Sequence, residues 1–204
     1  MGRACCSHKV KFDGLSAGFR RALMLVIAIN AVMFIVETSS GFYAESMALR
    51  ADALDFLGDT LTYALTLAVI GQPLRRRTAA ALFKGASLAV MGLWVFAATV
   101  YQALVLGQPN ALVMGSVGLL ALAANLTSVL LLLRWRDGDA NVRSVWLCSR
   151  NDAIANVAVI AAAAGVFSVG NAVPDLVVAG MIAGLFLYSS LRIVAQARRE
   201  LVFA

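Results

Sequence analysis

The sequence predicts an all-α fold, a six-helix transmembrane bundle with both termini cytoplasmic, and three observations support it. Of the 204 residues, 61% are hydrophobic and 14% are charged, whereas soluble domains are about half apolar and about a quarter charged. The mean hydropathy is +0.85, which indicates apolar stretches of membrane length. Lys and Arg gather at the ends of these stretches. We therefore expect a multi-pass integral membrane protein.

Six apolar segments are each about long enough for the roughly 20 residues that cross the hydrocarbon layer. They occupy residues 22–42, 46–71, 80–106, 110–133, 144–168 and 172–195. The connections are short, so neighbouring helices should pack antiparallel. We expect one transmembrane domain over residues 22–195, between an N-terminal cytoplasmic leader (1–21) and a short cytoplasmic tail (196–204).

The first segment follows a basic leader, as the apolar core of a secretory signal would, but it is longer than such a core. Glu37-Thr38-Ser39-Ser40 is also a poor cleavage site, which favours a retained helix. The third and fourth segments consist mostly of Leu, Ala, Val and Gly with weak periodicity, as expected for helices that face lipid. The sixth contains Gly180-Met-Ile-Ala-Gly184, a GxxxG motif that permits close helix approach within the chain or in a homodimer.

The distribution of Lys and Arg predicts the orientation. The leader, the loops at 72–79 and 134–143 and the tail are basic, whereas the connections near 43–45, 107–109 and 169–171 contain no Lys or Arg. Positive charge favours the cytoplasmic side, so both termini should be cytoplasmic. The net charge of +6 then reflects topology and contact with the lipid bilayer, and no nucleic-acid partner is expected. We expect the bacterial inner (plasma) membrane.

The second segment carries three aspartates, Asp52, Asp55 and Asp59. Each costs roughly 2.5–3.5 kcal/mol at the centre of a membrane helix. Spacings of three and four residues place all three side chains on one helix face. Clustered like charges repel, so the group must be partly protonated or hold a cation.

The fifth segment repeats this geometry, with Cys148 and Asp152 four residues apart. Two such pairs on facing helices offer four ligands. Three carboxylates and a thiolate suit Zn²⁺, with Cd²⁺ or Co²⁺ as alternatives, better than Mg²⁺. Structural roles are the competing interpretation: Asp52 could accept hydrogen bonds from Arg50 or a helix N-terminus, and Cys148 could be a small buried hydrophobe.

The run Ser46-Met-Ala-Leu-Arg-Ala-Asp52-Ala-Leu-Asp55-Phe-Leu-Gly-Asp59 resembles the second-helix signature of the cation diffusion facilitators. Asn151-Asp152-Ala-Ile-Ala-Asn-Val-Ala-Val resembles their fifth-helix segment, and Glu37 followed by Gly41 is similar to their first helix. The resemblance implies that the metal ligands are Asp55, Asp59, Cys148 and Asp152. It makes Asp52 an accessory residue that is usually not a direct ligand.

Two features depart from the family pattern. Cys148 stands where zinc-transporting members have the histidine usually assigned to proton coupling. The chain also ends soon after the sixth segment, where the family usually adds a cytoplasmic metal-binding domain, and the 134–143 loop contains no histidine. We therefore expect the transmembrane domain alone.

These residues and the resemblance predict an efflux transporter for a divalent transition-metal cation, driven by proton-coupled alternating access. The acids and the thiol would lose protons as the cation binds and regain them as it leaves. A proton-coupled exporter of small organic cations is the alternative, although only Phe56 and Tyr63 offer aromatic rings near the acids.

We expect neither an enzyme nor a cofactor. The sole histidine is His8, so the chain has neither a His-Glu-x-x-His motif nor a Ser–His pair in the bundle. His8 lies beside Cys5 and Cys6 in the leader. These three residues are accessory candidates that could capture incoming metal, or the cysteines could accept palmitate; the competing interpretation is a mobile tail with chance thiols.

Overall fold

The computed structural model describes residues 16–105, 107–137 and 140–202. Over these residues the chain is helical and contains no strand. The elements are α1 (Ala17–Tyr43), α2 (Met47–Val69), α3 (Leu74–Val105), α4 (Ala111–Leu132), the 3₁₀ turn η1 (Leu133–Trp135), α5 (Ala140–Val169) and α6 (Val173–Val202). This is the all-α, six-helix bundle that the sequence predicts.

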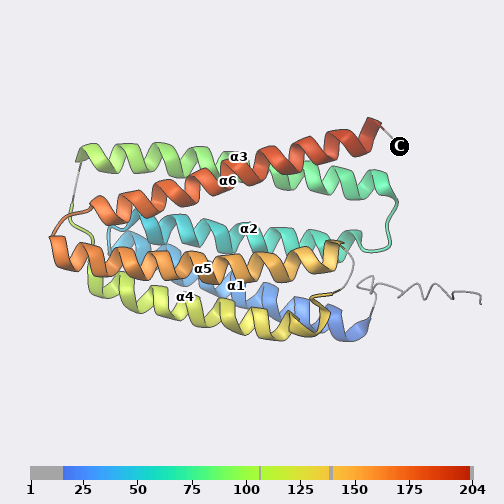
Figure 1. Ribbon diagram of the computed structural model, residues 1–204, viewed down its shortest axis with the longest axis horizontal. Helices are drawn as coiled ribbons and strands as arrows, with labels where there is room; N and C mark the ends of the chain where they lie inside the picture. Colours follow the sequence, from blue (N-terminus) through green and yellow to red (C-terminus); the bar gives the residue numbers. More distant parts are fainter. Residues whose placement is uncertain (1–15, 106, 138–139, 203–204) are drawn as a thin grey trace, which may run out of the picture.

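The helices form two groups that run side by side along the length of the molecule (Figure 1). One group contains α1, α2, α4 and α5, and the other is the pair of α3 and α6, which packs on α2 and α5. The first and last described residues lie at the same end of the bundle (Figure 1). We call this the terminal end.

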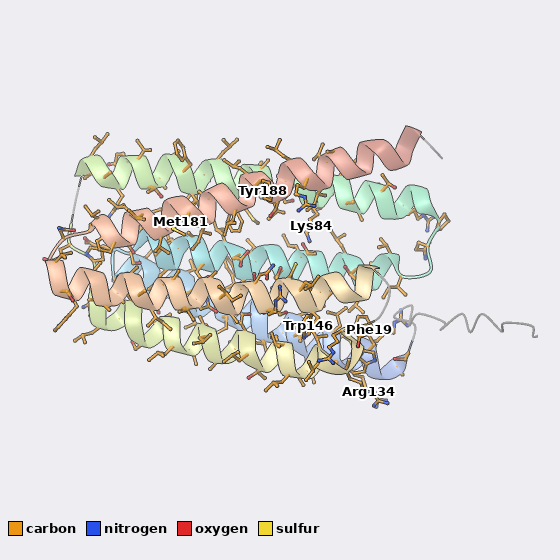
Figure 2. All side chains as sticks on the ribbon, in the orientation of Figure 1. Phe19, Lys84, Arg134, Trp146, Met181 and Tyr188 are labelled. Atoms are coloured by element: carbon orange, nitrogen blue, oxygen red, sulfur yellow. The ribbon has the colours of Figure 1, made fainter. Side chains whose placement is uncertain are left out.

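Five helices are long and apolar enough to cross a membrane, namely α1, α3, α4, α5 and α6. The helix α2 is not among them, because Arg50 and three aspartates interrupt its apolar sequence. It nevertheless runs inside the bundle, packed on α1 and α3. Side chains project outward from the other helices all around the bundle (Figure 2). Many of them are large and apolar, such as Leu104 and Leu112, which are 81% and 77% exposed. A lipid surround is the natural cover for such a surface.

Two helices extend beyond the predicted apolar segments. The third helix begins at Leu74 and not at residue 80, and the sixth continues to Val202, beyond residue 195. Hydropathy marks only the part of a helix within the hydrocarbon layer. Backbone hydrogen bonds continue outside that layer, so the helices extend into polar sequence.

Side-chain caps fix where two helices of the four-helix group begin. The Oγ of Ser46 accepts a hydrogen bond from the backbone N–H of Leu49 at 3.1 Å, and Oδ1 of Asn110 accepts one from Val113 at 3.1 Å. Both residues are favoured N-caps because their oxygens satisfy donors that the first helical turn leaves free.

Asp175, at the start of α6, adds a second cap to α2. Its carboxylate accepts hydrogen bonds from Ser46 Oγ at 2.5 Å and from the backbone N–H groups of Met47 and Ala48 at 2.7 and 3.1 Å. The carboxylate is fully buried. A negative charge at this position also interacts favourably with the helix dipole. Asp175 therefore fastens α6 to α2 at the end of the bundle opposite the terminal end.

Close packing of α3 on α6 depends on glycines of α3. A Cβ at Gly92 would lie 3.0 Å from Cγ of Leu187, and one at Gly85 would lie 2.8 Å from Cγ2 of Val194. At Gly180 and Gly184 an added Cβ would meet no atom of the described residues within 4 Å. Of the two roles left open for this GxxxG motif, close packing within the described residues is therefore wrong, and the homodimer contact stays a prediction.

Candidate functional site

A cavity of about 840 Å³ lies between the four-helix group and the α3–α6 pair. Its acidic and thiol side chains come from α2 and α5: Asp52, Asp55, Asp59, Cys148 and Asp152. All four predicted metal ligands, together with the predicted accessory residue Asp52, thus line the same space. Sequence spacing accounts for each pair, since residues four apart share a helix face.

The cavity lies near the middle of the bundle and extends toward the terminal end. On α2 its lining runs from Asp52 to Thr62, and on α6 from Ile182 to Ala195. The α6 side of the wall therefore continues toward the end of the helix where the described chain stops.

The carboxylates face one another across the α2–α5 interface. Asp55 and Asp152 interact with each other, and Asp152 also interacts with Asp59. The Oδ2 atom of Asp59 is buried and has no hydrogen-bond partner among the described residues. A buried oxygen of this kind is costly unless a donor or cation satisfies it. As the side chains stand, no three Cys, His, Asp or Glu residues of the described ranges are close enough to hold one ion, so coordination requires their side chains to rotate inward.

Residues 23–202 match the family model described as the cation efflux transmembrane domain. The chain belongs to the cation efflux family. The match covers nearly the whole of all six helices and confirms the resemblance found in the second and fifth segments. No curated relative matches this sequence. The protein is accordingly a multi-pass membrane protein of a family that transports cations.

Within this cation efflux domain, Asp52 has a different environment from the other acids. Nδ2 of Asn156 donates a hydrogen bond to Oδ2 of Asp52 at 2.6 Å, and Nδ2 of Asn125 donates to Oδ1 of Asn156 at 2.9 Å. These contacts join α2, α5 and α4. The predicted structural partners of Asp52 were wrong, since Arg50 donates instead to the Gly41 carbonyl at 3.1 Å.

Sequence reasoning missed the residues that support the acids of the cation efflux domain. Asn156 gave no signal, because an amide on an apolar helix has no fixed partner until the helices are placed. Asn125 indicated a polar contact between helices, which the bond to Asn156 confirms, but its partner could not be predicted. Glu37 was noted only as part of a pattern; its side chain is fully buried and interacts with Asp52. Tyr63 was treated only as a nearby aromatic ring, but its hydroxyl lies 3.3 Å from Ser149 Oγ and 3.3 Å from the Val145 carbonyl.

Cys148 is half-buried and its thiol is free. It lies one residue from Ser149, so the Tyr63 contacts hold this turn of α5 against α2. A structural role and a ligand role are both compatible with this placement. The leader residues Cys5, Cys6 and His8 lie outside the described residues of the cation efflux domain.

Two basic residues also line the cavity, and the sequence analysis did not single them out. Lys84 comes from α3 and Arg192 from α6. Lys84 could have been recognised from the sequence, because a lysine within a predicted membrane segment is rare and usually functional. The cavity wall therefore combines acids from one helix group with cations from the other.

Proposed function

We propose that this cation efflux domain exports divalent transition-metal ions, with Zn²⁺ as the main substrate. The supporting observation is that carboxylates and a thiol from two helices line one cavity in the interior of the bundle. Asp55, Asp59, Cys148 and Asp152 are the proposed ligands. Three hard oxygens and one soft sulfur suit a borderline ion, which leaves Cd²⁺ and Co²⁺ as further substrates.

The proposed transport cycle exchanges the ion for protons. Carboxyl and thiol groups bind metal only after losing their protons, so ion binding releases protons and protonation releases the ion. The cavity extends toward the terminal end, which the basic loops predict to be cytoplasmic. The ion would enter from the cytoplasm of a bacterial cell and leave across the plasma membrane. Such a cycle makes no covalent bond, so we propose a transporter and not an enzyme.

A small organic cation is the second candidate substrate. The cavity volume of about 840 Å³ lies within the roughly 300–1,000 Å³ of sites that bind small molecules. Phe186 and Tyr188 of α6 line it and provide aromatic surface that the sequence alone did not place near the acids. Growth of an expressing strain on toxic metals and on toxic organic cations would separate the two substrates.

The first prediction is that Asp55→Ala and Asp59→Ala each abolish Zn²⁺ uptake into proteoliposomes, at least about a hundredfold below the parent protein. Each removes a carboxylate from a four-ligand site, and the remaining ligands cannot complete the coordination shell. Uptake would be followed with a zinc-sensitive dye inside the vesicles.

Asp137→Ala is the matched control, because Asp137 is an exposed aspartate outside the cavity with a side chain 90% exposed. It should transport like the parent protein. Normal uptake by Asp55→Ala and Asp59→Ala would contradict the ligand assignment. The second candidate substrate is correct if the parent protein takes up an organic cation but no metal, and Asp55→Ala and Asp59→Ala abolish that uptake.

A further inference from the structure

Lys84 places a positive charge beside the acids of the cavity. It projects from the side of α3 that faces α2 (Figure 2) and lines the same space as the proposed ligands. It interacts electrostatically with Asp55, Asp59 and Cys148. Within the described part of the chain, however, Lys84 has no carboxylate oxygen within 4.0 Å, and Arg136–Asp137 is the ion pair that meets this limit.

The placement of Lys84 therefore differs from that of a fixed salt bridge. A direct ion pair would hold the ammonium on one carboxylate and leave the others unbalanced. From its present position the charge acts on several ligands at once and leaves space between them. Attraction between the ammonium and carboxylates that it does not touch remains considerable where water is scarce.

Arg192 does not serve this purpose. It also lines the cavity, but its side chain is exposed and its guanidinium carbon lies 5.7 Å from the centre of the Tyr188 ring. A cation over an aromatic face is already stabilised there. Lys84 is therefore the cation of the cavity wall that balances the acids.

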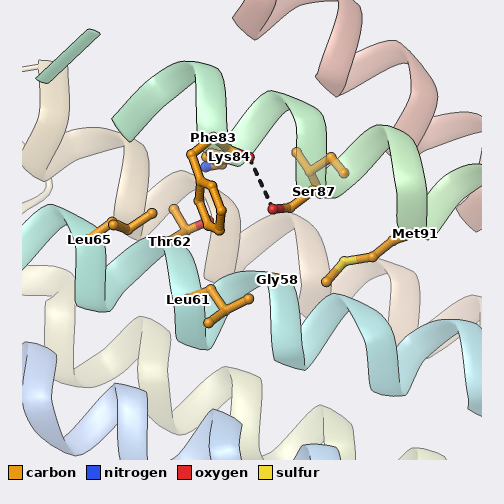
Figure 3. A pocket seen from close by; sticks show the side chains of 9 residues that line it. Gly58, Leu61, Thr62, Leu65, Phe83, Lys84, Ser87 and Met91 are labelled. Atoms are coloured by element: carbon orange, nitrogen blue, oxygen red, sulfur yellow. Dashed lines mark hydrogen bonds between the residues drawn. The ribbon is translucent and has the colours of Figure 1, made fainter. Parts of the chain in front are cut away.

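A second space adjoins Lys84. A slot of about 10 Å³ between α2 and α3 is lined by Lys84, Thr62 and Ser87 (Figure 3). This volume is about that needed for one water molecule. Lys84 and Thr62 line both the slot and the large cavity. The slot is otherwise lined by Gly58 and by the apolar side chains Leu61, Leu65, Phe83, Leu88 and Met91. The polar surroundings of the Lys84 ammonium therefore lie mainly on the side of the large cavity.

We propose that Lys84 is the internal counter-cation of the transport site, which balances the acids in the absence of metal and competes with the incoming ion. This inference rests on the proposed metal transport. Competition weakens binding of the ion and accelerates its release. Lys84 would thereby set the affinity of the site without touching the metal.

The test compares Lys84→Met with Lys84→Arg in Zn²⁺ uptake by proteoliposomes. Removing the charge should lower KM about tenfold and lower kcat, because binding tightens and release slows. Lys84→Arg keeps the charge and should hold both constants within about twofold of the parent protein. Arg136→Met removes a cation outside the cavity, on a side chain that is 55% exposed, and should change KM less than about twofold.

Equilibrium Zn²⁺ binding by the purified proteins supplies a second readout. Lys84→Met and Lys84→Gln should each bind Zn²⁺ about tenfold more tightly than the parent protein. An unchanged or weakened affinity in the variants that elute as monodisperse protein would overturn the role of Lys84. If the parent protein neither binds nor transports Zn²⁺, the proposed metal transport itself fails, which is a separate outcome.

Discussion

At the scale of single residues, the acids of α2 have two different tasks. Within the part of the chain that the structure describes, Asp59 has a buried oxygen without a hydrogen-bond partner, whereas Asp52 is 1% exposed and accepts a hydrogen bond from Asn156 at 2.6 Å. We propose that the first binds the cation, while the second already has a donor. The family resemblance already implied that Asp52 is an accessory residue, but the spacing of the acids does not separate them, because hydrogen-bond partners on other helices decide the difference.

This difference gives a second prediction, for Asp52→Asn and Asp59→Asn. An amide oxygen at residue 52 can still accept from Asn156, so Asp52→Asn should keep KM for Zn²⁺ within about threefold of the parent protein. Asp59→Asn removes a ligand charge and should abolish uptake. Uptake rates over a range of Zn²⁺ concentrations measure both variants, and equal loss in the two would show that Asp52 also binds the ion.

At the scale of helices, the number of helices and their orientation could be predicted from the sequence. Which helix faces contact each other could not. Hydropathy and the placement of Lys and Arg are local properties, so they indicate the number of helices and the shared end of the termini. The close contacts depend on which faces meet. Gly180 and Gly184 have the better-known motif, yet Gly85 and Gly92 make the close approach between α3 and α6.

A third prediction compares Gly92→Leu with Gly184→Leu. A side chain at Gly92 would collide with Leu187 and Phe186 of α6, where even a Cβ lies 3.0–3.1 Å from their atoms. Overpacking of this kind costs about 1–3 kcal/mol, so thermal unfolding in detergent should occur several degrees lower. Gly184→Leu meets no described atom within 4 Å of its Cβ and should leave the unfolding temperature unchanged.

The same pair of variants tests a homodimer. If two copies pack through the exposed GxxxG face, Gly184→Leu should convert the dimer to a monomer in light scattering while Gly92→Leu should not. Loss of stability in Gly184→Leu without any change of mass would place this face against another part of the same chain.

At the scale of the whole molecule, the cavity should be reachable by water from the terminal end. A fourth prediction uses Cys148, which lines it. In a Cys5→Ser, Cys6→Ser protein, a membrane-impermeant maleimide should label Cys148 when added on the side of the termini. Zn²⁺ should slow this labelling at least about fivefold, because a metal-bound thiolate is not free to react.

Introducing Cys148→Ser into the Cys5→Ser, Cys6→Ser protein gives a control that has no thiol to label. If Cys148 is labelled only from the opposite side of the membrane, the cavity does not open at the terminal end and the prediction fails. Equal labelling with and without Zn²⁺ would exclude Cys148 as a ligand while leaving the carboxylates in place.

The hydrogen bonds from Asp175 to the start of α2 have a mechanical consequence. They join the two helix groups at the end farthest from the termini, whereas the acids and cations face each other across open space nearer the terminal end. Because the two helix groups are joined at the Asp175 end, we expect any rearrangement of the α3–α6 pair relative to α2 and α5 to be larger at the terminal end.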